Sequence, residues 1–146
     1  MGFGLPAAIG ATFGRPDRTV CLFMGDGGLQ MTMQELGTVM EQKAPVKIIL
    51  LNNNYLGNVR PVAGNVLQSP LFVHTDDEPR LHADCVSYGI PSRRVAERGE
   101  LEEAIREMLD TDGPFLLEAC VIEEGNVLPM TPPGSSVNYM MLDLDC

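Results

Sequence analysis

The chain has 146 residues, the usual size of one domain, and 45% hydrophobic residues, which is enough to form a core. Its net charge of -10 excludes a typical nucleic-acid surface, which needs clustered Lys and Arg. An anionic ligand would need a locally positive site, made by a metal ion or by backbone N–H groups. No apolar run is long enough for a membrane span and no signal-peptide pattern opens the sequence, so we expect a cytoplasmic protein without membrane contact.

The predicted elements alternate between helices and strands. Small residues predict a helix over 4–13, and turn residues follow it. A short apolar strand then leads to Asp26. Periodic apolar residues predict a single helix over 29–42, Pro45 bars its continuation, and a second apolar strand ends at Asn53. After a long loop over 54–80, the patterns predict a helix at 81–89, a strand at 92–96, a helix at 99–113 and a strand at 114–122.

This order predicts an α/β fold with three layers, α/β/α, around a mostly parallel sheet. In such sheets ligands bind beyond the carboxyl ends of the strands. Asp26 and Asn53 follow two of the predicted strands, and 27 residues separate them, which is room for one helix and one returning strand. The two side chains are therefore expected at neighbouring strand ends. Because the chain opens directly on a helix, we expect a domain truncated at its N-terminus, as a fragment or as a small subunit that needs a partner.

The chemistry of residues 25–28, Gly-Asp-Gly-Gly, fits a bound diphosphate. Glycines let the backbone approach a ligand closely, and the following helix directs its free N–H groups toward the turn. Asp26 offers a carboxylate oxygen, and either Asn52 or Asn53 offers an amide oxygen. Together with diphosphate oxygens, these groups suit Mg²⁺ or Ca²⁺. Each motif alone is common in turns and strand ends, so the prediction depends on their spacing.

Other polar residues have simpler interpretations. No cysteine pair has the spacing of a zinc or dithiol motif. Cys21 and Cys120 lie in apolar runs and are predicted to be reduced core thiols. The only two histidines, His74 and His82, are predicted to be solvated loop residues, although a metal pair is possible. The adjacent arginines at 93 and 94 are predicted to carry surface charge.

Four segments carry a resemblance to a known family. The sequence "GDG", followed after this interval by "NN", is the cofactor motif of thiamin-diphosphate (ThDP) enzymes. The segments "MGFGLPAAIGA", "GDGGLQMTMQEL", "PVKIILLNNNYLGNVR" and "NVLPMTPPG" resemble the C-terminal domain of the acetolactate synthase (acetohydroxyacid synthase) large subunit. The resemblance implies a ThDP- and Mg²⁺-binding domain over 1–125 and a C-terminal arm or tail over 126–146.

The resemblance also implies roles for individual residues. Asp26 and Asn53 would bind Mg²⁺ through their side chains, and Tyr55 through its main-chain carbonyl. Met1 would be the apolar wedge that bends the cofactor. The cofactor-binding set implied by the resemblance is Met1, Gly25, Asp26, Gly27, Gly28, Asn53, Tyr55, Leu56, Gly57 and Asn58.

The implied activity is decarboxylation of pyruvate on ThDP and condensation with a second 2-oxo acid, in branched-chain amino acid biosynthesis. The family's catalytic glutamate lies in an N-terminal domain, so no catalytic residue can be assigned here, and FAD would belong to an absent middle domain. The cofactor would lie against a pyrimidine-binding domain of another subunit, which implies an oligomer and inactivity alone.

Residue 58 and the loop at 61–64 differ from the usual synthase pattern. The alternatives are a non-catalytic ThDP-binding fragment and a component of another ThDP-dependent 2-oxo acid decarboxylase or carboligase.

Overall fold

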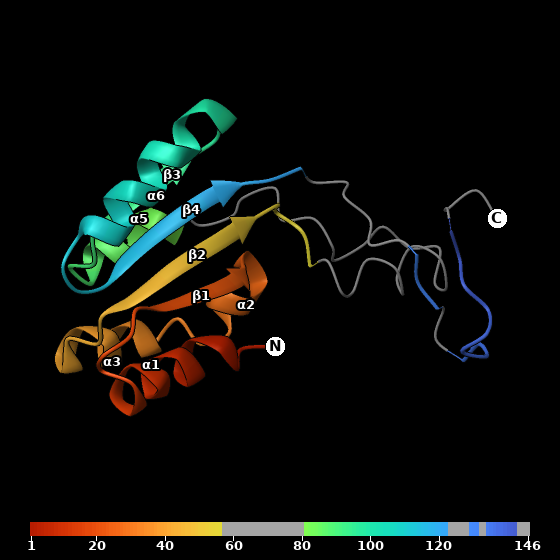
Figure 1. Cartoon of the computed structure of the whole chain (residues 1–146), viewed down its shortest axis with the longest axis horizontal. Helices are drawn as coiled ribbons and strands as arrows, with labels where there is room; N and C mark the ends of the chain where they lie inside the picture. The colour runs from red at the N-terminus through yellow and green to blue at the C-terminus, as the bar shows by residue number, and fades with distance from the viewer. Residues whose placement is uncertain (57–80, 123–128, 132–133, 143–146) are drawn as a thin grey trace.

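The computed structural model describes residues 1–56, 81–122, 129–131 and 134–142. Four parallel strands form one sheet in the order β1-β2-β4-β3 (Figure 1). None of the helices in these ranges is long and apolar enough to cross a membrane. The strands are β1 (Val20–Gly25), β2 (Val46–Asn52), β3 (Ser92–Val95) and β4 (Phe115–Cys120).

Helices cover both faces of this sheet, which confirms the predicted three-layer α/β/α arrangement. The larger buried cluster joins one face of the sheet to residues of α1, α2, α3 and α5, and the smaller cluster joins the opposite face to α6. Apolar residues at helical spacing form both interfaces, as the sequence patterns require. The helices are α1 (Gly4–Gly14), α2 (Asp26–Gln30), α3 (Glu35–Gln42), α5 (Leu81–Ser87) and α6 (Leu101–Asp110), with a 3₁₀ turn η1 (Arg98–Glu100) before α6.

The helix predicted over 29–42 is wrong as a single element, because the segment forms two short helices. Between α2 and α3 the backbone makes bonds three residues apart, from the Thr32 N–H to the Leu29 carbonyl and from the Glu35 N–H to the Thr32 carbonyl. This tighter turn redirects the chain. Leu29 and Leu36 are nevertheless both fully buried, so the apolar periodicity was a correct signal for the core but not for the break.

The two faces of β1 differ in burial, and the prediction of a core thiol at Cys21 is therefore wrong. Cys21 is exposed, and so is Phe23, at 69% of its surface. Their register partners on β2 show that both side chains lie on the α6 face of the sheet. Among the described residues, the cluster beneath α6 includes Ile49 of β2 but no residue of β1. Cys120 is half-buried, whereas Cys85 of α5 is the fully buried thiol.

The register places the carboxyl ends of β1 and β2 side by side. Gly25 pairs with Leu51, and Asn52 pairs with Cys120 on the next strand. The segments that follow β1, β2 and β4 therefore leave the sheet at one edge (Figure 1). Near the C-terminus Met130 and Met141 form an isolated antiparallel bridge. The predicted domain boundary at 125/126 lies outside the described residues and stays a prediction.

Candidate functional site

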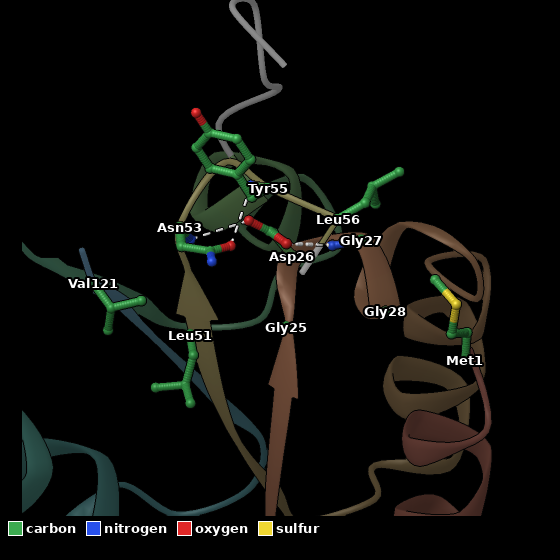
Figure 2. Close-up of a pocket in the computed structure, with 10 residues that line it drawn as sticks. All are labelled: Met1, Gly25, Asp26, Gly27, Gly28, Leu51, Asn53, Tyr55, Leu56 and Val121. Atoms are coloured by element: carbon green, nitrogen blue, oxygen red, sulfur yellow. Dashed lines mark hydrogen bonds between the residues drawn. The ribbon is translucent and has the colours of Figure 1, made fainter. Parts of the chain in front are cut away.

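A pocket of about 450 Å³ opens at this edge of the sheet (Figure 2). Figure 2 shows Leu51 and Val121 on one side of it and Met1 on the other, with Asp26 and Asn53 extending toward each other between the tips of β1 and β2. The lining combines an apolar wall with a small polar centre, as small-molecule sites commonly do. The lining residues are Met1, Gly25, Asp26, Gly27, Gly28, Leu51, Asn53, Tyr55, Leu56 and Val121.

Backbone N–H groups hold the Asp26 carboxylate in place. Asp26 Oδ1 accepts the Gly27 N–H at 2.6 Å, and Oδ2 accepts the N–H groups of Asn53 at 3.1 Å and Asn54 at 2.9 Å. The residue is only 3% exposed, so these bonds compensate for the loss of hydration of a buried charge. They also attach the end of β1 to the loop that follows β2.

The loop after β2 is shaped by its own asparagines. Asn53 Oδ1 accepts the Tyr55 N–H at 3.1 Å, which closes a local side-chain turn. Asn54 adopts a left-handed conformation with φ 56°, a region that Asn tolerates better than most residues. This geometry turns the Asn53 side chain into the pocket and brings Tyr55 to its rim.

The structure separates the two asparagines that the sequence left as alternatives. Asn52 is buried outside the pocket lining. Its Nδ2 donates to Glu118 Oε1 at 2.9 Å, and its Oδ1 accepts the Asn54 N–H at 3.0 Å. Both ends of its amide are therefore engaged within the protein, which leaves Asn53 as the amide that faces the pocket.

At one glycine of the turn a side chain would meet a neighbouring leucine, which would have to move. A Cβ on Gly27 would lie 2.5 Å from Leu56 Cδ2, whereas at Gly28 the nearest atom would be Met24 Cε at 3.9 Å. Leu56 therefore covers Gly27, and both line the pocket. The helix α2 begins at Asp26 and has only five residues.

Of the residues that the sequence marked for cofactor binding, Gly57 and Asn58 lie outside the described residues. The others all line the pocket. Two lining residues were missed, Leu51 and Val121. Both are apolar: Leu51 is the last residue but one of β2, and Val121 directly follows the adjacent strand β4. The Val121 N–H donates to the Asn52 carbonyl at 2.9 Å. Strand register, rather than residue type, would have been the signal for them.

The prediction that His82 is a solvated loop residue is wrong. His82 lies on α5, is half-buried, and its Nδ1 lies 2.7 Å from Glu118 Oε2. Arg94 Nε lies 3.5 Å from Glu118 Oε1, so this arginine also reaches the buried carboxylate, although most of its side chain is exposed as predicted. Arg93 pairs with Glu107 of α6 at 2.7 Å. His74 lies outside the described residues.

The donor set fits a hard cation that binds together with an anionic ligand. From the described residues, Asp26 Oδ1 accepts one hydrogen bond and Asn53 Oδ1 accepts one, so each oxygen keeps a lone pair for a metal. Carboxylate and amide oxygens suit Mg²⁺, which usually takes its remaining ligands from phosphates and water. No group of three acidic, His or Cys side chains suited to a metal occurs in the described ranges.

Sequence comparison matches residues 1–119 to the family described as "Thiamine pyrophosphate enzyme, C-terminal TPP binding domain". The chain is 41% identical over 142 residues to the acetolactate synthase isozyme 2 large subunit of Escherichia coli (strain K12), covering 97% of this chain and 26% of that protein. It is 40% identical over 154 residues to the chloroplastic acetolactate synthase of Arabidopsis thaliana, covering 99% of this chain and 23% of that protein.

A solved structure agrees with the sequence relatives. The fold resembles a thiamine diphosphate-dependent 4-hydroxybenzoylformate decarboxylase from Rhodococcus jostii RHA1, with a TM-score of 0.76 and 30% identity over 84% of this chain and 23% of that one. The chain spans about a quarter of the length of the relatives it matches. With the family match over residues 1–119, this places the chain in the thiamine pyrophosphate enzyme family, as a C-terminal TPP-binding domain related to that of acetolactate synthase.

Proposed function

We propose that this chain is the ThDP- and Mg²⁺-binding component of an acetolactate-synthase-like carboligase. Such an enzyme decarboxylates pyruvate and joins the remaining two-carbon unit to a second 2-oxo acid, in branched-chain amino acid biosynthesis. The observation that supports this most strongly is the placement of Asp26 and Asn53 in one pocket at neighbouring strand ends. The identity of about 40% to acetolactate synthases favours this activity over others in the family.

In this proposal Asp26 and Asn53 hold Mg²⁺ through their side-chain oxygens, and Tyr55 contributes its main-chain carbonyl. The metal offsets the negative charge of the diphosphate, which a chain with a net charge of -10 would otherwise repel. The diphosphate lies against the backbone at Gly27 and Gly28. Because the Gly27 N–H already donates to Asp26, the ligand must compete with that bond or share the donor.

The bound cofactor supplies the carbanion chemistry that removes carbon dioxide from a 2-oxo acid and forms the new carbon–carbon bond. The chain's own residues bind and orient it. Met1, Leu51, Leu56 and Val121 form apolar walls of the pocket and would exclude water from the reacting end of the ligand.

The site needs a partner domain in this proposal. The pocket is open, and Met1 is 70% exposed at its edge. The family's glutamate has no counterpart that we can assign in this chain, and the relatives carry about three quarters of their length elsewhere. We therefore propose that a pyrimidine-binding domain, in another subunit, supplies the missing wall and the catalytic carboxylate. FAD, where required, belongs to that additional part.

Complementation tests the proposal. The chain would be mixed with a polypeptide that bears the pyrimidine-binding and middle domains, together with ThDP, Mg²⁺ and FAD, and acetolactate formed from pyruvate would be measured. We expect activity in the mixture and none in either part. Asp26→Ala in this chain serves as the control and is expected to abolish the activity. Absence of complementation, in a mixture shown to form a complex, would contradict the proposal.

A second candidate is a 2-oxo acid decarboxylase component, and the similarity to the Rhodococcus decarboxylase favours it. Product analysis of the reconstituted enzyme distinguishes the two. A carboligase yields a 2-hydroxy-2-methyl-3-oxo acid, whereas a simple decarboxylase yields an aldehyde. A domain that binds ThDP and Mg²⁺ but forms neither product with any partner would be a non-catalytic binder. The cytoplasmic location also stays a prediction.

A further inference from the structure

Glu118 is a charged residue in the middle of a buried strand. It is 2% exposed and lies on β4 next to Leu116 and Leu117, which are both buried. A buried carboxylate contributes little to stability compared with a well-packed apolar residue of similar size. The position therefore calls for an explanation other than core packing.

Hydrogen bonds connect Glu118 to the loop over 53–56, which carries the proposed metal ligands Asn53 and Tyr55 and is called the metal-binding loop below. Its Oε1 accepts the Asn52 Nδ2 group at 2.9 Å. Because a carboxylate can only accept, it fixes which end of the Asn52 amide faces β4. The amide oxygen must then face the loop, where it accepts the Asn54 N–H at 3.0 Å.

The same Asn54 N–H also donates to Asp26 Oδ2 at 2.9 Å. Four residues on β4, on β2, in the following loop and at the start of α2 are thus connected by hydrogen bonds. If the Asn52 amide were reversed, its NH₂ group would face the Asn54 N–H, and two donors would oppose each other. The loop would then lose one of the bonds that hold it against Asp26.

We propose that Glu118 is a positioning residue for the metal-binding loop, acting through the orientation of the Asn52 amide. This inference rests on the proposed function for its effect on cofactor affinity, but its effect on the loop does not. His82 Nδ1 at 2.7 Å and Arg94 Nε at 3.5 Å approach the carboxylate from α5 and β3, and they hold it in the rotamer that meets Asn52.

Glu118→Leu tests this in the full chain. Amide hydrogen exchange by NMR should show faster exchange at Asn53 and Asn54, with the exchange of β1 and β2 unchanged. Calorimetric titration with ThDP in the presence of Mg²⁺ should show affinity lower by about 10- to 100-fold, the usual range for residues that orient metal ligands. Glu118→Gln should restore most of the slow exchange at Asn53 and Asn54 and most of the ThDP affinity, because its amide oxygen can still accept the Asn52 NH₂ group.

Asn52→Ala, alone and combined with Glu118→Leu, tests whether Glu118 acts through Asn52. If Glu118 acts through Asn52, Asn52→Ala should reproduce the loss, and adding Glu118→Leu should weaken binding no further. The matched control is Glu107→Leu, which removes the same charge from the exposed pair with Arg93, distant from the pocket. It should leave loop exchange and affinity unchanged.

Three outcomes would overturn the inference. One is a Glu118→Leu variant that is less stable but has parental exchange at Asn53 and Asn54. Another is additive losses in the double variant, and the third is an equal loss in Glu107→Leu. If Glu118→Leu does not fold, Asn52→Ala tests the same link from its other end. If the parent chain binds no ThDP, the proposed function fails, while the exchange measurement still decides whether Glu118 positions the loop.

Discussion

The two ends of the central sheet each place a buried charged side chain beside a pocket, and they use the charge differently. At the carboxyl end, Asp26 lines a pocket of about 450 Å³. At the amino end, Lys47 is 4% exposed and lines a smaller pocket of about 270 Å³. Lys47 Nζ donates to the carbonyls of Thr111 at 2.5 Å and Gly113 at 2.7 Å.

The difference lies in what the hydrogen bonds connect. The bonds to Asp26 come from a loop whose side chains also face the pocket, so the carboxylate and its neighbours form one polar centre. The bonds from Lys47 attach the turn between α6 and β4 to the start of β2. We infer that the first charge serves ligand binding and the second serves stability. A buried charge beside a pocket is therefore not by itself evidence of a binding site.

The largest effect is expected at the carboxyl end. Asp26→Asn should lower the affinity for ThDP with Mg²⁺ by at least about 100-fold, because it removes the only carboxylate among the pocket-lining residues. Calorimetric titration measures this. Asp17→Asn is the matched control, since it removes the same charge from an exposed pair with Arg15. Equal losses in the two variants would show that net charge, and not the site, controls binding.

The second-largest effect is expected at the amino end of the sheet, where a substitution should change stability but not ThDP affinity. Lys47→Met should lower the free energy of unfolding by about 1–3 kcal/mol, because two carbonyls lose a charged donor. Urea unfolding followed by circular dichroism measures this. ThDP affinity, determined in the same buffer, should stay at the parental value. If Lys47→Met lowered the affinity for ThDP, Lys47 would not serve stability alone, and the contrast between the two ends of the sheet would be wrong.

A smaller effect is expected at the turn that follows β1. Gly27→Ala should weaken ThDP binding about twofold to tenfold, because the new methyl group displaces Leu56 from its rotamer. Gly10→Ala is the control, because a Cβ there meets nothing within 4 Å and Gly10 does not line the pocket. If Gly28→Ala weakens binding more than Gly27→Ala, close approach of the ligand, and not Leu56, explains the need for glycine.

The smallest effect is a pH dependence at the amino end. Burial lowers the pKa of Lys47 from 10.5. In the window between the folded and unfolded pKa values the unfolded chain binds more protons, so the parent's stability should rise with pH there relative to Lys47→Met. Urea unfolding of both chains from neutral pH to about 10.5 checks this. A difference between the chains that falls with pH would contradict the assigned cause.

Local patterns predicted most of the fold because each element carries its own signal. The stripe over 101–109 predicted α6, and the apolar runs ending near Asp26 and Asn53 predicted β1 and β2. The break between α2 and α3 was missed, since the apolar spacing continues across the turn and the bonds three residues apart leave no mark in composition. Asn52 and Asn53 could not be told apart, because the difference depends on Glu118, 66 residues beyond Asn52.

By itself, the sequence determined the strand–helix order, the parallel sheet and the spacing that brings Asp26 and Asn53 to one edge, because these follow from short-range periodicity and from the geometry of a crossover. Only the tertiary structure decided which charges serve the pocket. Strand register put Leu51 and Val121 in its wall, and contact with Glu118 turned Asn52 away from it. The position of α6 left Cys21 and Phe23 exposed. Each of these depends on contacts between segments far apart in the chain, which no local pattern encodes.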